Sequence, residues 1–232
     1  MPEEAPLSDK RKKDVIAAQC PVDPTQGPHQ SRTDERRTSR LADAAAFLRG
    51  FLTHPFEVAS VMPSSAHLES RVVNAADLAQ ARCVVELGPG TGGTTRALLR
   101  TMAPRARLLA IEVNPDFCDR LRRLIDDPRL MVQAGSAESL AEALSTRGLP
   151  AADVVVSGIP FSVLPRDVAQ RIAAAIHDNL APGGRLVAYQ CSADVARYIT
   201  PHLGPPLTTW EWRSLPPMRV FVWVKPAADA TQ

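Results

Sequence analysis

A glycine-rich segment with an acidic residue downstream is the part of the sequence best suited to do chemistry. Residues 84–93 read VVELGPGTGG, and glycines there let the backbone turn sharply and bring a helix N-terminus close to a ligand. Glu112 follows 24 residues after Gly88, where a carboxylate can accept hydrogen bonds from both hydroxyls of a ribose. Together they predict a site for an adenosine-containing ligand; the simpler alternative is a structural turn beside a surface glutamate.

The glycines alone do not choose the ligand. Gly88, Gly90 and Gly93 also satisfy the dinucleotide fingerprint G-x-G-x-x-G. Glu86 lies two residues before the first glycine, and a carboxylate there suits a cationic amino-acid group better than a pyrophosphate. S-adenosylmethionine carries such a group on adenosine, so the pattern favours it over a nicotinamide dinucleotide.

The surrounding residues predict the elements that position these groups. Strand-like runs alternate with helical patterns, which is typical of a parallel, doubly wound α/β sheet. The strand-like runs are 82–87, 107–113, 130–133, 153–156 and 185–190, and the helical ones are 66–79, 94–102, 116–125, 138–145, 167–180 and 193–199. Two further strand-like runs, 207–213 and 218–224, predict a C-terminal β-hairpin with one antiparallel strand. Trp210 and Trp212 share a face of this hairpin and are interpreted as core or interface residues.

The N-terminal part differs in character from the rest. Residues 1–35 are polar, proline-bearing and of mixed charge, which predicts a disordered tail. Residues 36–60 carry an amphipathic helical pattern whose charged residues include Arg36, Arg37, Arg40 and Arg49 against Asp43. Such a helix either packs on the core or contacts anionic lipid, and both can hold at once. The catalytic domain is expected over residues 61–226.

Composition excludes several classes of function. Lys and Arg number 27 against 25 Asp and Glu, so a generally basic nucleic-acid-binding surface is not expected. Aromatic residues, at 5%, are too few for a repeated base-stacking platform. The four cysteines are far apart and the histidines show no ligand spacing, so we expect free thiols and no metal. Without a secretory signal or an apolar run of about 18 residues, a cytoplasmic protein that does not span a bilayer is expected.

From about residue 60 to residue 225 the sequence resembles the class I S-adenosylmethionine-dependent methyltransferases. It shows their E-x-G-x-G-x-G motif at 86–92, an acid after the second strand, and a short polar element, GSAE, at 135–138. The resemblance implies a Rossmann-like fold with a seven-stranded, mostly parallel sheet, and S-adenosylmethionine as the cofactor. It also implies a set of cofactor-binding residues: Glu86, Gly88, Gly90, Thr91, Gly92, Glu112, Val113, Ser136 and Ala137.

A second motif concerns the methyl acceptor. Residues 157–161 read SGIPF, similar to an element of nitrogen methyltransferases in which Asn, Asp or Ser precedes Pro-Phe or Pro-Tyr. The resemblance implies that the polar residue and nearby carbonyls accept hydrogen bonds from the target amine, while the aromatic ring packs against the substrate. The catalytic candidates are therefore Ser157, Gly158, Pro160 and Phe161, with Tyr189 and His67 as candidates for a general base. A strand that ends in a proline turn above a core phenylalanine is the alternative interpretation.

Two methyltransferase families share this element. The rRNA adenine dimethyltransferases have N-L-P-Y in its place and normally a helical C-terminal domain, for which we expect no room after Val224. The soluble bacterial phospholipid N-methyltransferases are more similar. They show S-G-L-P or S-G-I-P, a P-S-S turn like that at 63–65 and a P-P-x-x-V strand like that at 216–220. This second similarity extends from about Phe47 to Val224.

The second similarity implies stepwise methylation of phosphatidylethanolamine toward phosphatidylcholine, by a peripheral protein at the inner, cytoplasmic face of a membrane. Its implied partners are an anionic phospholipid surface and a lipid headgroup, without RNA and without metal. The alternatives are an RNA adenine N6-methyltransferase, another small-molecule N-methyltransferase, and a non-catalytic protein that binds S-adenosylmethionine or lipid.

Overall fold

The computed structural model describes residues 66–227 of the 232-residue chain. The expected disordered tail (1–35), the amphipathic helix region (36–60) and the P-S-S turn lie outside the described residues. The described part contains the glycine-rich segment, the SGIPF element and the C-terminal hairpin.

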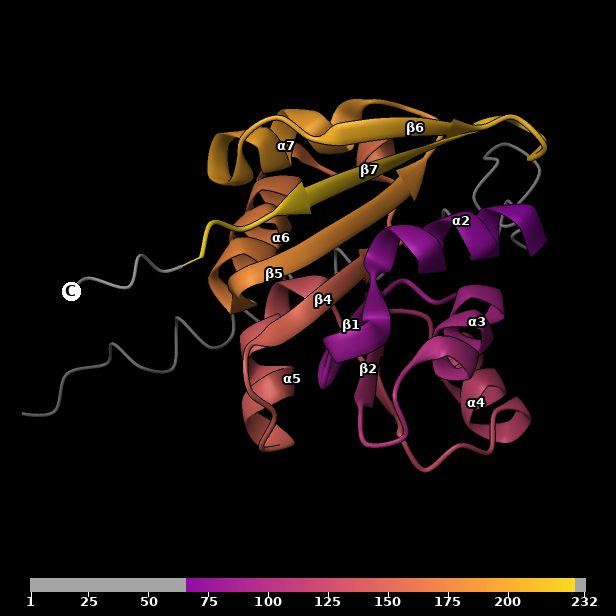
Figure 1. Ribbon diagram of the computed structural model, residues 1–232. Helices are drawn as coiled ribbons and strands as arrows, with labels where there is room; N and C mark the ends of the chain where they lie inside the picture. Colours follow the sequence, from indigo (N-terminus) through magenta and orange to yellow (C-terminus); the bar gives the residue numbers. More distant parts are fainter. Residues whose placement is uncertain (1–65, 228–232) are drawn as a thin grey trace, which may run out of the picture. The chain divides into compact units, whose positions relative to one another are not determined.

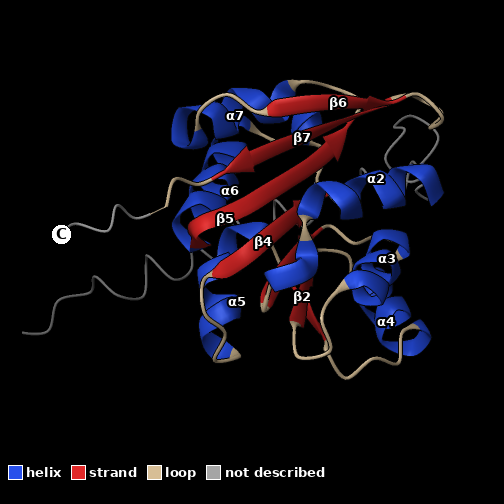
Figure 2. Ribbon diagram, in the orientation of Figure 1, coloured by secondary structure: helices blue, strands red, loops and turns tan. Residues whose placement is uncertain are grey.

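Within the described residues, seven strands form one sheet in the order β3-β2-β1-β4-β5-β7-β6 (Figure 2). The strands are β1 (Cys83–Leu87), β2 (Arg107–Glu112), β3 (Leu130–Ala134), β4 (Ala152–Ser157), β5 (Leu180–Gln190), β6 (Leu207–Glu211) and β7 (Met218–Val224). Strands β1 to β5 pair in parallel, whereas β7 runs antiparallel to both β5 and β6. The predicted Rossmann-like, mostly parallel sheet with a C-terminal hairpin is confirmed.

Helices cover both faces of the sheet (Figure 1). On one face lie α2 (Ala66–Ala76), α3 (Gly93–Thr101) and α4 (Pro115–Leu124); on the other lie α5 (Leu140–Thr146), α6 (Arg166–Asn179) and α7 (Asp194–Leu203). Successive residues of a strand point to opposite faces. Val84 therefore packs in the core beneath α2 and α3, while Val85 packs in the core beneath α5, α6 and α7. Both cores fix the ends of the strands from which the predicted site residues extend.

The strand order reverses at β1, which lies between β2 and β4. In this architecture ligands bind at the carboxyl ends of the strands beside such a reversal. Hydrogen bonds tie these ends together, because Gly88 N donates to Ile111 O at 2.9 Å and Gly158 N donates to Leu87 O at 2.9 Å. The glycine-rich segment and the SGIPF element are far apart in sequence. These hydrogen bonds therefore bring them together at the carboxyl ends of β1 and β4.

The structure moves some of the predicted boundaries. The helix predicted at 66–79 ends at Ala76, because Asp77 adopts a left-handed conformation with φ 51°. The strand predicted at 185–190 already begins at Leu180, which pairs with Ala152 before a shift of register lets Arg185 pair with Val154. Residues 182–184, Pro-Gly-Gly, are typical of a turn, but here they lie within β5 where its pairing with β4 is irregular.

Candidate active site

The glycine-rich segment forms a tight loop between β1 and α3. Gly88 and Gly92 adopt φ values of 73° and 82°, a region that side-chain-bearing residues rarely occupy. A Cβ at Gly92 would lie 2.6 Å from Leu121 Cδ2, and one at Gly88 would lie 3.3 Å from Ile159 Cγ1. The loop therefore needs glycine at both places to close against α4 and against the loop that follows β4.

Glu112 ends β2 directly beside this loop. Its side chain is 4% exposed. Oε2 accepts a hydrogen bond from Gly90 N at 3.0 Å, and Oε1 accepts one from Asn114 N at 2.9 Å. Burial raises the pKa of Glu112, while the N–H groups of Asn114 and Gly90 act in the opposite direction. The carboxylate is thus held in a fixed orientation at the edge of the sheet.

Glu86 lies deeper, within β1, and is fully buried. Thr95, in the first turn of α3, donates its hydroxyl to Glu86 Oε2 at 2.6 Å, whereas Oε1 has no hydrogen-bond partner among the described residues. Burial raises the pKa of Glu86 to about 8, even though the Thr95 hydrogen bond lowers it. An unpartnered, buried carboxyl oxygen beneath the loop is a place where a cationic group would be stabilised.

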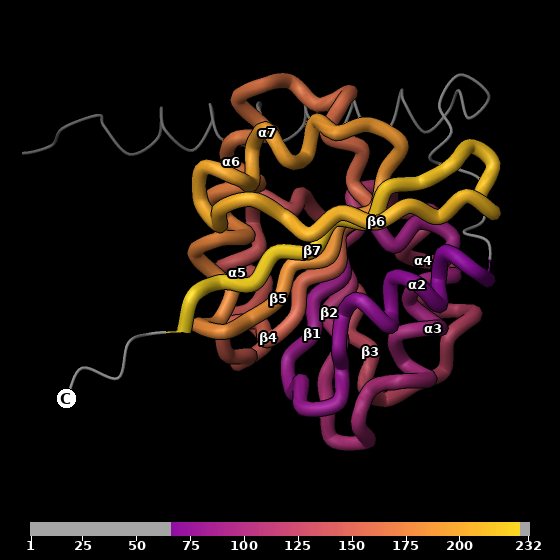
Figure 3. Tube along the Cα trace, turned by 45° about the horizontal axis from the view of Figure 1, so that its top comes forward, coloured from indigo at the N-terminus to yellow at the C-terminus, as the bar shows by residue number. Residues whose placement is uncertain are grey.

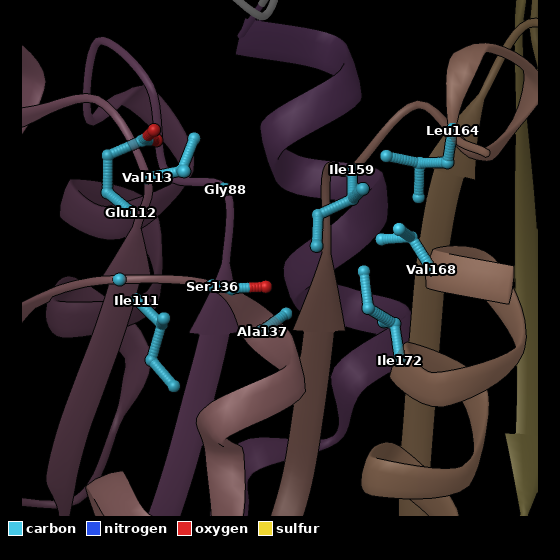
Figure 4. A pocket seen from close by; sticks show the side chains of 11 residues that line it. Gly88, Ile111, Glu112, Val113, Ser136, Ala137, Ile159, Leu164, Val168 and Ile172 are labelled. Atoms are coloured by element: carbon cyan, nitrogen blue, oxygen red, sulfur yellow. The ribbon is translucent and has the colours of Figure 1, made fainter. Parts of the chain in front are cut away.

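A pocket opens beside Glu112 at the carboxyl ends of β2, β3 and β4 (Figure 4). It is lined by Gly88, Ile111, Glu112, Val113, Gly135, Ser136, Ala137, Ile159, Leu164, Val168 and Ile172. In Figure 4, the residues from the β2 and β3 ends face Ile159, Leu164, Val168 and Ile172 across the opening. Apolar walls that face one another suit a flat base, and the carboxylate at one side suits a ribose.

The SGIPF element lies next to this pocket, and Tyr189 near the end of β5 packs against it. The Tyr189 hydroxyl is 3.2 Å from Thr94 Oγ1, and a Cβ at Gly158 would lie 2.6 Å from the same hydroxyl. Gly158 therefore allows the phenol to approach the loop closely. Gln190 Nε2 donates to Ile159 O at 3.2 Å, which holds the same loop from β5.

Comparisons with known proteins agree with this geometry. A model described as a methyltransferase domain matches residues 84–184. The chain is 34% identical over 145 residues to the ornithine lipid N-methyltransferase of Singulisphaera acidiphila, covering 62% of this chain and 76% of that protein. It is 38% identical over 94 residues to the ribosomal RNA small subunit methyltransferase A of Parasynechococcus marenigrum, covering 40% of this chain and 30% of that protein.

Among solved structures, the N-methyltransferase NodS from Bradyrhizobium japonicum superimposes with a TM-score of 0.57 at 15% identity, over 68% of this chain and 94% of NodS. That likeness shows the fold. The chain belongs to the class I S-adenosylmethionine-dependent methyltransferases. The predicted enzyme class, an S-adenosylmethionine-dependent N-methyltransferase, is thereby confirmed at the level of the family, and so is the cofactor.

The residues of this methyltransferase fit S-adenosylmethionine. Five of the predicted cofactor-binding residues line the pocket: Gly88, Glu112, Val113, Ser136 and Ala137. The pocket lining does not include the other four: Glu86, Gly90, Thr91 and Gly92. Gly90 donates a hydrogen bond to Glu112. Glu86 lies in β1, and Thr91 and Gly92 lie between β1 and α3. Ser136 Oγ donates to Glu138 Oε2 at 3.0 Å and accepts from Glu138 N at 3.2 Å, so this side chain holds the turn above the pocket.

The residues predicted to bind the methyl acceptor or to act as a base differ in their surroundings. Ser157 is fully buried, and its Oγ accepts a 3.4 Å hydrogen bond from Ile159 N. The Phe161 ring is 1% exposed and packs against Tyr198 of α7, with ring centroids 6.0 Å apart. In this structure the ring therefore supports the loop from the core side instead of facing a substrate. Pro160 is half-buried in the same loop, and His67 is exposed in the first turn of α2, away from the pocket lining.

Several residues at the site give no signal in the sequence. Ile159, Leu164, Val168 and Ile172 form one wall of the pocket, but apolar residues on a loop and a helix are the same types that build a core. Glu69 of α2 points at the start of α3, where a Cβ at Gly93 would lie too close to its carboxylate. Burial raises the pKa of Glu69, and Arg100 lies 3.9 Å away. Only the packing of α2 on α3 reveals this third acid.

Three further observations concern features outside the pocket. Within residues 66–227, no group of three His, Cys, Asp or Glu side chains is arranged to hold a metal ion. Over the same range, no helix is both long and apolar enough to cross a membrane. Cys83, Cys118 and Cys191 are free, and burial raises the pKa of both the Cys83 and Cys118 thiols to about 11.

Proposed function

We propose that this methyltransferase transfers methyl groups to the amine of a membrane lipid, with phosphatidylethanolamine and its methylated intermediates as substrates on the way to phosphatidylcholine. The observation that carries the proposal is the 34% identity to an ornithine lipid N-methyltransferase over 76% of that protein. Ornithine lipid and phosphatidylethanolamine both present a primary amine at a bilayer surface. The S-G-I-P element and the P-P-x-x-V strand, which are similar to those of phospholipid N-methyltransferases, support phosphatidylethanolamine as the substrate.

The cofactor-binding half of the mechanism uses the loop and the two buried acids. S-adenosylmethionine supplies an activated methyl group on a sulfonium. The apolar walls would hold the base, and the Glu112 carboxylate would accept the ribose hydroxyls. The glycine loop brings backbone N–H groups close without side chains in the way. Glu86 and its unpartnered Oε1 would stabilise the cationic amino-acid end.

The substrate ammonium must lose a proton to solvent before its nitrogen lone pair can attack the methyl group. A lipid amine has a pKa near that of lysine, about 10, and is therefore protonated at neutral pH. The loop carbonyls after β4 and the Tyr189 hydroxyl, which lies against Gly158 of that loop, are proposed to accept hydrogen bonds from the amine. Tyr189 and Gly158 thus position the nitrogen, and exclusion of water supplies much of the rate.

The proposed location is the inner face of the cytoplasmic membrane. The amphipathic pattern of residues 36–60 carries the basic residues for reversible attachment to anionic lipid, at about 1 kcal/mol for each basic residue near the surface. The catalytic domain is proposed over residues 61–226. Neither RNA nor metal takes part.

Initial rates of methyl transfer from labelled S-adenosylmethionine test the substrate. The same full-length protein is given vesicles of phosphatidylethanolamine, vesicles of ornithine lipid, free ethanolamine, and small ribosomal subunits. We expect the highest rate with phosphatidylethanolamine and almost none with free ethanolamine. A higher rate with ornithine lipid overturns the choice of headgroup.

A second candidate function is methylation of ribosomal RNA, because the chain is 38% identical over 94 residues to a ribosomal RNA methyltransferase. That alignment covers only 30% of the ribosomal RNA enzyme. In the same experiment, transfer to ribosomal subunits without transfer to either lipid supports this candidate and overturns lipid methylation.

A further inference from the structure

The turn between β6 and β7 is an exposed apolar and aromatic surface. It consists of residues 212–217, WRSLPP, and is called the hairpin tip below. Trp212 is 68% exposed and Leu215 is 81% exposed, the largest exposed fraction among the exposed large hydrophobic residues of the described chain. Of the two interpretations of Trp212, the core one is therefore wrong, because β6 ends one residue before it, at Glu211, whereas the interface one is not contradicted.

The hairpin tip is held in place by its neighbours. The Trp212 ring stacks on Trp210, with ring centroids 4.8 Å apart and an interplanar angle of 14°. The Arg219 guanidinium carbon lies 4.5 Å from the Trp210 ring centroid on a neighbouring strand. Two aromatic rings and a cation thus form one stack at the base of the tip.

An ion pair between the buried carboxylate of Glu211 and the partly exposed guanidinium of Arg71 joins this hairpin to α2. Glu211, 4% exposed, accepts a hydrogen bond from Arg71 Nε at 2.9 Å and another from Arg213 N at 2.9 Å. Arg71 lowers the pKa of Glu211, so this carboxylate is ionised and its charge is matched. The tip is therefore presented in a defined direction from the end of the sheet.

The tip points toward the carboxyl ends of the parallel strands, where the active site lies. Since β7 is antiparallel to both neighbours, β6 points the same way as β5 and ends at the same edge. Arg219 pairs with Gln190 at the end of β5, one residue beyond Tyr189. Figures 1 and 3 show the turn between β6 and β7 extending beyond the end of β5. The tip and the loop after β4 therefore lie at the same end of the sheet, at the carboxyl ends of β4, β5 and β6.

We propose that the hairpin tip inserts into the headgroup region of the membrane that carries the substrate, and so holds the active-site edge against the bilayer. This inference rests on the proposed lipid substrate. Trp and Leu at the tip suit the boundary between headgroups and acyl chains. Arg213 and Arg219 suit anionic phospholipid, and residues 212–217 contain no acid. The mixture of indole, aliphatic and guanidinium groups favours a lipid surface over a purely apolar partner.

Tryptophan fluorescence tests the contact directly. The three tryptophans of the chain are Trp210, Trp212 and Trp223, and Trp223 is 1% exposed in the core with its Nε1 bonded to Gly204 O. Quenching by lipids with brominated acyl chains therefore reports on the hairpin and not on residues 1–65. We expect quenching with brominated phosphatidylethanolamine and phosphatidylglycerol vesicles, and loss of most of it in Trp212→Ser. Vesicle-bound protein without quenching overturns the proposal.

A pair of double variants measures the strength of the contact. Trp212→Ser with Leu215→Ser should weaken binding to the same vesicles by about tenfold or more, since two large side chains no longer leave water. The control is Leu124→Ser with Leu207→Ser, which removes two side chains that are 53% and 76% exposed away from the tip. Equal affinities of the two variants contradict the proposal.

Methylation kinetics of the tip variant, Trp212→Ser with Leu215→Ser, distinguish a failure of the membrane contact from a failure of the proposed function. The tip variant should lose activity on phosphatidylethanolamine vesicles through a higher apparent KM, and keep the wild-type kcat on a short-chain, soluble phosphatidylethanolamine. Normal lipid methylation with unchanged vesicle binding overturns the tip alone, whereas absence of methylation on every aminolipid overturns the proposed function. If the tip variant instead abolishes a dimer seen in solution, the surface binds a second copy and the membrane proposal is wrong.

Discussion

Three glutamates of unlike surroundings lie around one loop, and their differences define the chemistry of the site. Glu112 is held by two backbone N–H groups at the pocket, Glu86 is fully buried with one unpartnered oxygen, and Glu69 faces the start of α3. Burial raises the pKa of all three. A cationic ligand would offset the cost of ionising acids in such a place.

Glu112→Ala should weaken S-adenosylmethionine binding by about 100-fold or more, because two hydrogen bonds to a charged group contribute about 1.5–3 kcal/mol each. Isothermal titration calorimetry measures this affinity. Glu142→Ala, an exposed acid on α5, is the matched control and should bind as the wild type does. An unchanged affinity in Glu112→Ala would exclude the ribose assignment.

Glu86→Gln should change stability in a pH-dependent way. Because the pKa of Glu86 is raised from 4.5 to about 8, the folded protein keeps a proton that the unfolded chain loses between these values. The stability that this neutral acid contributes is full below pH 4.5 and lost as the pH rises through about 8. Glutamine cannot ionise, so the variant should gain stability relative to the wild type from pH 5 to pH 9. Urea unfolding at these two pH values measures the difference, and a constant difference would show that Glu86 does not titrate there.

Sequence chemistry located the polar residues of the site better than the apolar ones. Glu112 and the glycine loop were identified because few residue types can serve a ribose or permit positive φ. Ile159 and Ile172 were not identified, because a wall for a base needs only apolar surface, which most of the core also provides. Phe161 was placed against the substrate by its motif, but its ring packs into the core.

At the scale of elements, the site depends on how closely α4 and the loop after β4 approach the glycine loop. Alternation of strands and helices predicted the order of the elements, since each needs one buried face. The ends of elements were predicted less well where proline or glycine suggests a break that the structure does not contain. Helix α7 continues through Pro201 to Leu203, and β5 begins before its Pro-Gly-Gly. Tertiary contacts decide these cases.

Gly92→Ala should disrupt this approach. Its φ of 82° is unfavourable for alanine, and its Cβ would also meet Leu121 Cδ2 at 2.6 Å. Gly148→Ala is the matched control, because φ is 61° and nothing lies within 4 Å of the new Cβ. Backbone strain alone should cost about 1 kcal/mol in the control, and the clash should add about 1–3 kcal/mol in Gly92→Ala. Equal free energies of unfolding for the two variants would show that the contact with α4 is unimportant.

At the scale of the whole molecule, a net charge of +2 conceals an uneven distribution. Basic residues gather in residues 36–49 of the sequence, whereas buried acids surround the cofactor loop. A protein arranged in this way can attach to an anionic surface through one part while another part binds a cation.

Replacing Arg36, Arg37 and Arg40 with Glu should weaken binding to phosphatidylglycerol-containing vesicles and reduce its salt dependence, since these charges interact through screened electrostatics. Cofactor affinity should stay within twofold of the wild type. Sedimentation with vesicles at low and high salt measures the effect. Unchanged vesicle binding would show that residues 36–60 do not provide the attachment.

We propose that this methyltransferase methylates a lipid amine at the pocket beside Glu112. The most direct measurement is mass spectrometry of the lipids after incubation of the full-length protein with S-adenosylmethionine and phosphatidylethanolamine–phosphatidylglycerol vesicles. We expect mono-, di- and trimethylated ethanolamine lipids with the wild type and, at a limiting S-adenosylmethionine concentration, much less product with a folded Glu112→Ala variant. Unmodified phosphatidylethanolamine after incubation with cofactor-bound wild type, or equal products from both proteins, would contradict it.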